Sequence, residues 1–386
     1  MIPTFSFNTT PSIQFGNGVV SRLGELARVR MGGRVLVVTD PGLVATGIIA
    51  QVAGILRAAS VDFNIFSEVE ADPPEAVIMK AVGAARDAGA MGVIGVGGGS
   101  SLDVAKLVAL LAVGKEKLKN IYGVGNAKGP RLPLILVPTT SGTGSEVTPI
   151  SIVTTGAAEK MGVVSPVLIP DLALLDPELT YGLPPHVTAA TGIDAMVHAI
   201  EAFASASANN NPVSRTLALQ ALTLMGRSVL AAVQDGKNVA ARGEMLLGSM
   251  LAGQAFANSP VAAVHALAYP LGGHFHIPHG LSNALVLPHV LRFNCVTAPD
   301  AYAEMAPHAF PDLARFEGQE RAAAFCEALA DLSRDCDLPQ TLQAMKIPQD
   351  WLPRLARDAM NQSRLLVNNP RPVAEADALA IYTAAY

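Results

Sequence analysis

Residues 91 to 106 have the sequence MGVIGVGGGSSLDVAK, in which an apolar run is followed by three glycines and then by a helix-favouring segment. The run from Met91 to Val96 predicts a buried strand. The three glycines, Gly97, Gly98 and Gly99, allow the backbone to approach a ligand closely. The helix expected from about Ser100 directs unpaired amide groups and the positive end of its dipole toward that ligand. The segment therefore predicts a phosphate-binding loop at the end of a strand.

Ser100 and Asp103 also fit a second role, because together they match a helix capping box, which would be purely structural. A capping box does not require three consecutive glycines, so phosphate binding is the favoured interpretation. The common dinucleotide fingerprint Gly-x-Gly-x-x-Gly is incomplete, since Gly95 and Gly97 are present but Ser100 occupies the third glycine position. We therefore expect a variant of the usual cofactor loop.

Strands and helices alternate on both sides of this segment. Further strands are expected over Arg34 to Thr39, Asp62 to Phe66 and Leu134 to Val137, with helices up to about Ala59 and from Glu75 to about Ala88. This alternation predicts a Rossmann-like parallel sheet with helices on both faces.

The start of the chain has a different pattern. Apolar and polar residues alternate between Thr4 and Gly18, which predicts an opening β-hairpin that serves either as a simple edge or as a pairing surface for a second subunit. Short β-like runs are also expected between Val147 and Pro177.

A second polar loop follows the strand that ends near Val137. In it, Thr139, Thr140 and Thr143 surround two glycines, and hydroxyls at the carboxyl end of a strand suit hydrogen bonds to a ribose or a phosphate. An ordinary polar turn explains the loop equally well. Lys160 is the one cation near a possible anionic ligand in this part of the chain, although a solvated loop lysine is the alternative.

Past residue 185 the sequence changes character. Long stretches rich in Ala, Leu and Met predict helices over Val187 to Ser205, Pro212 to Gln234 and Ala240 to Ala257, and strand patterns nearly vanish. We therefore expect an α/β domain over residues 1–185 and an all-α domain over residues 186–386.

The helical half contains four side chains that suit a metal ion. Asp194 and His198 are four residues apart in a helix-favouring run, so both leave the same face of that helix. His265 lies in an apolar stretch, and His279 is expected in a Pro-His-Gly turn. One carboxylate and three imidazoles form a suitable set for a divalent transition metal with a position left for a substrate oxygen. Ordinary surface or core roles are the alternative.

The bulk composition restricts the class of protein. The chain has 386 residues, of which 50% are hydrophobic and 15% charged, and its net charge is -5, so we expect a folded two-domain protein and no nucleic-acid partner. Its three cysteines have no Cys-x-x-Cys spacing, which predicts a reducing compartment. Without a leader-like start or a long uninterrupted apolar run, we expect a cytoplasmic protein with no membrane partner.

Taken together, these motifs resemble the iron-containing, group III alcohol dehydrogenase family, over nearly the whole chain. The matching segments are Phe15-Gly16, Thr39-Asp40, Gly97 to Lys106, Pro138 to Thr148, Asp176 to Thr180, Gly192 to Glu201, His265 to Gly280 and Asn368 to Pro372. The resemblance implies a dehydroquinate synthase-like architecture and the following roles. The pyrophosphate of NAD would be bound by Gly98, Gly99 and Ser100, the cofactor also by Thr139, Thr140 and Thr143, and Fe²⁺, or Zn²⁺, by Asp194, His198, His265 and His279.

Further residues are assigned to the cofactor site by the same resemblance. Gly97 and Asp103 belong to the glycine motif. Lys160 stays a candidate cofactor-binding residue because it is a cation near a possible anionic ligand, and not because of the resemblance. Asp40 follows the first strand, where the family contacts the adenosine ribose, so its carboxylate predicts NAD(H) over NADP(H), although an Asp-Pro-Gly turn former is the alternative. Asp72 is placed near the nicotinamide ribose, where many members have Asn.

One position near the metal departs from the family pattern. Many members have a second histidine four residues after the third ligand, and here that residue is Tyr269, which we keep as a candidate catalytic residue. We expect Pro270 and the glycines after it to kink or end the helix there. His274 or His276 could replace the missing histidine, but a surface or packing role is favoured for each.

The resemblance implies a small primary alcohol or aldehyde as substrate and a homodimer as the assembly. Two alternatives remain within related chemistry: a hydroxyacid-oxoacid transhydrogenase or maleylacetate-reductase-like enzyme, and a lyase similar to dehydroquinate synthase. Both act on anionic substrates and would need cations that the metal-site segments do not supply. A binding protein without catalysis is the third alternative.

Overall fold

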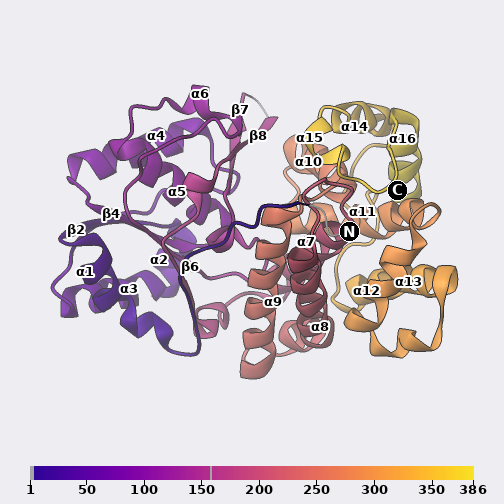
Figure 1. The fold of residues 1–386 in the computed structure, drawn as a ribbon, viewed down its shortest axis with the longest axis horizontal. Coiled ribbons are helices and arrows are strands. Elements are labelled where there is room, and N and C mark those ends of the chain that lie inside the picture. Colours follow the sequence, from indigo (N-terminus) through magenta and orange to yellow (C-terminus); the bar gives the residue numbers. More distant parts are fainter. Residues whose placement is uncertain (1–3, 157–158) are drawn as a thin grey trace. The chain divides into compact units, whose positions relative to one another are not determined.

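The computed structural model describes residues 4–156 and 159–386. The chain divides into two compact units, one formed by Asn8–Gly182 and the other by Leu183–Tyr386 together with the start of the chain up to Phe7 (Figure 1). The first unit is α/β and the second is helical. The start of the chain is joined to the helical unit by two hydrogen bonds between Ser6 and Asn209, each 2.9 Å long.

The α/β unit is built on a six-stranded sheet in which every pairing is parallel. The strand order is β1-β9-β6-β4-β2-β3. The bounds are β1 Ile13–Phe15, β2 Arg34–Val38, β3 Asp62–Phe66, β4 Gly92–Gly97, β6 Leu134–Pro138 and β9 Leu172–Leu175. The parallel sheet predicted from the alternation of strands and helices is therefore confirmed.

Successive residues of the central strands face opposite sides of the sheet, and each side is covered by helices. Val35, Val37 and Ile94 pack with α1 (Leu23–Met31) and α3 (Ile48–Ala58), whereas Leu36 and Val93 pack with α4 (Glu75–Asp87) and α5 (Gly99–Val113). Figure 1 shows these two helix layers on either side of the strands. Because both faces are buried, the strands are apolar throughout instead of alternating.

The opening hairpin predicted between Thr4 and Gly18 is wrong. The one strand described there is β1, and it pairs in parallel with β9, with Ile13 opposite Ala173. The alternation in the sequence is real, but it is satisfied by a partner strand about 160 residues away. The strand runs expected after Val147 are confirmed, since β7 (Ile150–Thr155) and β8 (Glu159–Val164) form an antiparallel pair, and β5 (Gly123–Val124) lies along β8.

A buried polar cluster joins α5 to the small sheet. Lys106 is fully buried, and its Nζ donates to the Ile150 carbonyl at 2.7 Å and to the Thr148 hydroxyl at 3.2 Å. Its Nζ also lies 3.5 Å from a carboxylate oxygen of Asp103. Glu146, in the short 3-10 helix Ser145–Val147, is buried beside this cluster. These contacts fix the loop after β6 against the first half of α5.

The helical unit is built from the helices α7 to α16. They are α7 Pro185–Ala204, α8 Pro212–Gln234, α9 Val239–Asn258, α10 Ala263–Phe275, α11 His279–Cys295, α12 Pro299–Ala309, α13 Gly318–Asp335, α14 Leu352–Ala359, α15 Ser363–Leu366 and α16 Glu375–Ala384. Asn211 caps α8 through Ser214, and Pro212 occupies its first position, which explains why its start is clear in the sequence. Within the described residues, α8 is the helix long and apolar enough to cross a membrane, but its packing against α7, α9 and α12 accounts for its apolar residues.

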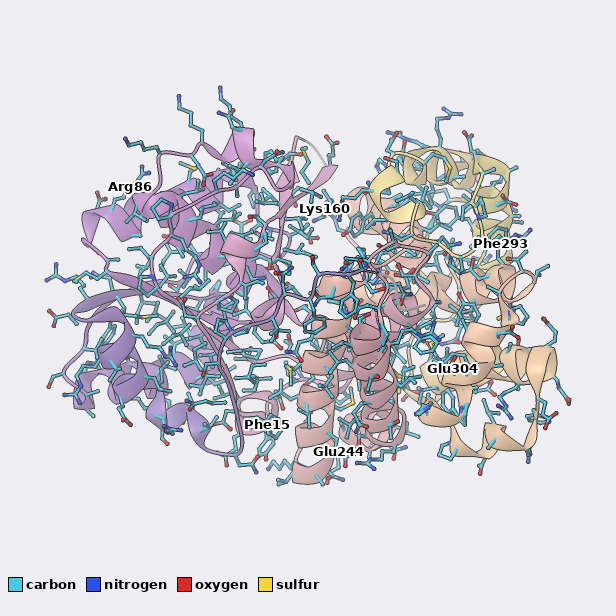
Figure 2. All side chains as sticks on the ribbon, in the orientation of Figure 1. Phe15, Arg86, Lys160, Glu244, Phe293 and Glu304 are labelled. Carbon is cyan, nitrogen blue, oxygen red and sulfur yellow. The ribbon has the colours of Figure 1, made fainter. Side chains whose placement is uncertain are left out.

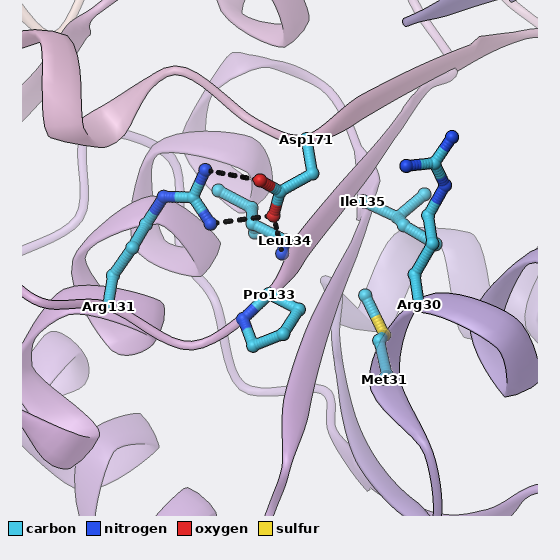
Figure 3. Close-up of a pocket in the computed structure, with 7 residues that line it drawn as sticks. All are labelled: Arg30, Met31, Arg131, Pro133, Leu134, Ile135 and Asp171. Atoms are coloured by element: carbon cyan, nitrogen blue, oxygen red, sulfur yellow. Dashed lines mark hydrogen bonds and ion pairs between the residues drawn. The ribbon is translucent and has the colours of Figure 1, made fainter. Parts of the chain in front are cut away.

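A pocket of about 400 Å³ opens at the amino ends of β6 and β9 (Figure 3). Arg131 dominates its polar wall, where its guanidinium donates twice to Asp171, at 2.7 and 3.1 Å, and also to three backbone carbonyls. These bonds use the donors of Arg131 within the fold. Ligands of parallel sheets bind at the opposite, carboxyl edge. We therefore assign this pocket a structural role.

The buried Glu146 predicts a pH-dependent stability. Burial raises the pKa of Glu146 to about 7, against the lowering effects of a backbone hydrogen bond and of Lys106. Between pH 4.5 and pH 7 the folded chain retains this proton while the unfolded chain loses it, so the free energy of unfolding decreases as pH rises, by about 3 kcal/mol. We expect the free energy of unfolding of Glu146→Gln to equal that of the parent protein at pH 4.5 and to exceed it by about 3 kcal/mol at pH 8. Urea denaturation at both values measures this difference.

Glu25→Gln on the exposed face of α1 is the matched control, since it changes the same chemical group outside the core. A Glu146→Gln protein that gained no stability at pH 8 relative to pH 4.5 would contradict the assignment.

Candidate metal centre and cofactor loop

The helical unit brings together the four side chains predicted to bind a metal. One ligand atom from each of Asp194, His198, His265 and His279 lies within 4.8 Å of the other three. The Nε2 atoms of His265 and His279 are 3.8 and 3.7 Å from the same Asp194 oxygen. We refer to these four residues as the cage.

Three helices build the cage. Asp194 and His198 leave one face of α7, one turn apart, as their spacing predicts. His265 lies in the first turn of α10, and His279 is the first residue of α11. His279 was expected in a turn, and that expectation is wrong, because Pro278 is the N-cap of α11 and the helix begins directly after it.

A glycine allows two of these helices to approach closely. A Cβ atom on Gly280 would lie 2.4 Å from the carbonyl oxygen of Ala190 and 3.2 Å from the Cβ of Asp194. No side chain fits in that space. The contact of α11 with α7 at this point is what places His279, the neighbour of Gly280, against Asp194.

Aromatic rings line the inner wall of the cage. The rings of His198 and His265 are stacked with their centroids 4.8 Å apart, and Phe256 stacks on His198 at 4.4 Å. Asp194, His198 and His265 are buried, whereas the side chain of His279 is 40% exposed. The cage is therefore closed on the side of Phe256 and open on the side of His279.

The charge state of Asp194 suits a cation. Burial alone raises the pKa of this carboxyl, but His198, His279, His265 and the amide of Asn283 together bring it below its ordinary value. The group is therefore ionised at neutral pH, which makes it an anionic oxygen ligand beside three imidazoles. This set fits Fe²⁺ or Zn²⁺, and four protein ligands leave a position for a further oxygen.

Tyr269 lies beside the open side of the cage. It is half-buried on α10, and its ring centroid is 5.9 Å from that of His279. The sequence predicted that α10 kinks or ends at Pro270. The helix does not end there, since it continues to Phe275. His276 is its C-cap and adopts a left-handed backbone conformation. His274 has a packing role, because its Nε2 lies 2.7 Å from an Asp358 oxygen and its ring lies beside Trp351.

The α/β unit places the predicted cofactor loops at one edge of the sheet. Because β2, β4 and β6 are adjacent and parallel, the residues after them meet at their carboxyl ends. Thr139 donates its backbone N–H to the Gly97 carbonyl at 3.0 Å. Thr140 lies beside Gly98, and a Cβ atom on Gly99 would approach the Thr143 side chain to 2.8 Å. Gly99 is therefore needed for the two loops to pack together.

The amino end of α5 remains available to a ligand. Gly98 is its N-cap, and no side chain within the described part of the chain caps it. The capping box considered for Ser100 and Asp103 is thus absent. Asp103 instead accepts hydrogen bonds from the Ser145 hydroxyl at 2.5 Å and from the Ile152 N–H at 2.8 Å, so its role is to position the loop and β7.

Asp72 and Lys160 form an ion pair. The Nζ of Lys160 lies 2.6 Å from Asp72 and donates to the Thr154 hydroxyl at 2.9 Å. Lys160 lies on β8 (Figure 2). Its side chain is largely shielded from solvent, unlike that of a solvated loop lysine. The backbone of Asp72 adopts a positive φ of 54°, which fixes the loop before α4.

Asp40 has a structural role in addition to any contact with a cofactor. It is the N-cap of α2 (Pro41–Thr46), where one carboxylate oxygen accepts from the Leu43 N–H at 3.0 Å. Its other oxygen accepts from the Ser101 hydroxyl at 3.3 Å, which joins the loop after β2 to the start of α5.

Two hydroxyls at the same edge of the sheet lie in segments that resemble the family, but the sequence assigned them no role of their own. The Oγ1 of Thr39 and the Oγ of Ser141 are buried, and neither has a hydrogen-bond partner among the described residues. Thr39 follows β2 and Ser141 follows β6. Buried polar groups without partners are costly in a finished fold, so these hydroxyls suit a polar ligand at this edge. Their position directly after apolar strands is the signal that could have identified them.

Comparison with known proteins covers nearly the whole chain. The model of the iron-containing alcohol dehydrogenase family matches residues 10–177, and that of the C-terminal domain of the same family matches residues 188–386. Long-chain-alcohol dehydrogenase 1 of Geobacillus thermodenitrificans is 44% identical over 92% of this chain and 91% of its own. A crystal structure of a 1,3-propanediol oxidoreductase is 33% identical and has a TM-score of 0.95, covering 99% of this chain and all of its own. Sulfoacetaldehyde reductase of Bifidobacterium kashiwanohense, solved in complex with NAD⁺, is 27% identical with a TM-score of 0.87, covering 99% and 98% of the two chains.

Gly280→Ala tests whether the close contact of α11 with α7 maintains the cage. The added Cβ would lie 2.4 Å from the Ala190 carbonyl, so α11 must shift away from α7 and carry His279 with it. We expect a loss of about 1–3 kcal/mol in the free energy of unfolding and weaker binding of Zn²⁺. Thermal denaturation and chelator competition measure the two effects. Gly54→Ala on α3, where nothing lies within 4 Å, is the control, and equal metal affinity in both variants would rule out this explanation.

Proposed function

The chain belongs to the iron-containing alcohol dehydrogenase family, and we propose that it transfers hydride between NAD(H) and a small primary alcohol or its aldehyde in a metal-dependent reaction. The observation that carries this proposal is the cage of one ionised carboxylate and three imidazoles. It is closed on one side by Phe256 and open on the side of His279, where a substrate oxygen has access.

The cage supplies the metal ligands, and the metal supplies the Lewis acidity. When bound by Asp194, His198, His265 and His279, a divalent cation would polarise the oxygen of the alcohol or aldehyde. The family suggests Fe²⁺, and the nitrogen-rich donor set suits Zn²⁺ as well, so the metal in the cell would depend on availability. Tyr269, beside His279, would contact the substrate at the open side.

The glycine loop of the α/β unit is the proposed NAD site. The uncapped amino end of α5 would bind the pyrophosphate through the N–H groups that follow Gly98. Thr139, Thr140 and Thr143 line the neighbouring loop. The NAD⁺ complex of the sulfoacetaldehyde reductase relative supports this choice of cofactor. Bound NAD would accept or donate the hydride at its nicotinamide ring.

We also propose a cytoplasmic homodimer. The three cysteines, Cys295, Cys326 and Cys336, are free and buried, as expected in a reducing compartment. Light scattering coupled to size exclusion would measure the assembly.

Removing a ligand tests the function directly. We expect Asp194→Ala or His279→Ala to abolish turnover of a panel of alcohols and aldehydes followed at 340 nm, because the cage loses its anionic oxygen or its exposed imidazole. NAD binding, measured by calorimetry, should be unchanged, since both residues belong to the helical unit. The parent protein stripped of metal should be inactive and should recover with Fe²⁺ or Zn²⁺. Full turnover in either variant would refute the proposed site.

The charge of Asp40 is expected to select NAD over NADP. Asp40→Ser keeps an oxygen that can cap α2 while removing the negative charge that would repel a 2′-phosphate. We expect the ratio of kcat/KM for NAD to that for NADP to fall by about tenfold or more, which corresponds to about 1.4 kcal/mol. Asp62→Ser on the exposed edge strand β3 is the control. Equal use of both cofactors by the parent protein would remove the claim.

A further inference from the structure

His265 is contacted on its two ring nitrogens by two different side chains. On one side, Glu201 of α7 lies with a carboxylate oxygen 2.7 Å from Nδ1. On the other side, Asn283 of α11 lies with its amide nitrogen 3.3 Å from Nε2. All three residues are buried. Neither Glu201 nor Asn283 is among the predicted metal ligands.

The carboxylate of Glu201 is fixed in place by the backbone. Its second oxygen accepts the N–H of Val264 at 2.6 Å. One oxygen of this carboxylate therefore accepts from the backbone, and the other faces Nδ1 of the ring. Because an ionised carboxylate only accepts hydrogen bonds, the proton of the His265 ring must be on Nδ1.

The orientation of Asn283 leads to the same tautomer. Its Nδ2 donates to an Asp194 oxygen at 2.5 Å, and the reverse orientation would bring two acceptor oxygens together at that distance. One amide hydrogen is used by Asp194, so the other faces Nε2 of His265 and Nε2 of His279, each 3.3 Å from the amide nitrogen. A donor facing Nε2 of His265 agrees with a lone pair on that nitrogen and a proton on Nδ1. The Oδ1 of Asn283 is left buried and without a partner among the described residues.

We propose that Glu201 is a positioning residue that holds His265 in the Nδ1–H tautomer, so that the lone pair of Nε2 faces the cage. A metal bound there would take the place of the Asn283 amide at that lone pair. This inference rests on the proposed function for the identity of the cage as a metal site. Residues that orient metal-binding histidines in this way change metal affinity by about 10- to 100-fold when they are replaced. Asn283 also keeps one oxygen of Asp194 directed into the cage.

Glu201→Gln is expected to change the tautomer of His265 while the side chain at position 201 keeps its size. The N–H of Val264 still needs an acceptor, so the amide oxygen of the glutamine faces Val264 and its NH₂ group faces His265. Nδ1 must then accept a hydrogen bond, and the ring proton moves to Nε2, which faces the cage. The side chain has the same size, but the metal-binding nitrogen is blocked.

The experiment measures metal affinity and the ring tautomer separately. We expect Glu201→Gln to bind Zn²⁺ about 10- to 100-fold more weakly in chelator competition. In protein labelled with ¹⁵N-histidine and free of metal, we expect the parent His265 to be protonated on Nδ1 and the variant on Nε2, with the signal assigned by its loss in His265→Asn. Glu304→Gln, an exposed partner of Arg215 on α12, is the matched control and should leave both readouts unchanged (Figure 2).

The outcomes distinguish this inference from the proposed function. A parent protein with His265 protonated on Nε2, or a Glu201→Gln protein with unaltered Zn²⁺ affinity, would overturn the inference. The tautomer measurement on the parent protein does not depend on the variant being stable. A parent protein that bound no divalent metal at all would instead overturn the proposed function, while the tautomer result would still decide the role of Glu201.

Discussion

The close contact between α11 and α7 is the constraint on which the candidate metal centre depends. At Gly280 the two backbones approach so nearly that no side chain fits between them. His279 precedes this contact and Asn283 follows it by one turn, so both are carried to Asp194 by the same packing event. The cage is therefore a product of helix packing in the core, and its stability and its affinity for a cation share one physical origin.

In the α/β unit, a close contact likewise determines the structure at the edge of the sheet. The tight packing of the loop after β6 against the glycines after β4 uses Thr143 and Gly99 as facing surfaces. Asp103 and Lys106, one and two turns further along α5, contact the segment after β6 through buried polar groups, since Asp103 accepts from Ser145 and Lys106 donates to Thr148. The motif from Gly97 to Lys106 thus leaves the amino end of α5 without a side-chain cap and also fixes the position of the loop after β6.

The features that could be predicted from the sequence are those encoded locally. The start of α8 is marked by Asn211 and Pro212, and Asp194 and His198 share a face because they are four residues apart. Features that depend on distant partners were missed or wrong. The partner of β1 is β9, and Glu201 lies 64 residues from the His265 ring that it contacts. No local sequence pattern predicts either pairing. His279 was assigned to a turn because proline and glycine flank it, whereas Pro278 serves as a helix cap.

The polypeptide connects the two units at two points. Because residues up to Phe7 belong to the helical unit and Asn8 begins the α/β unit, the polypeptide passes between the units twice, the second time after Gly182. A proteolytic nick after Phe7 would sever only residues 1–7, whereas a nick after Gly182 would leave residues 1–182 joined to the helical unit without a covalent bond, through contacts such as those of Ser6 with Asn209.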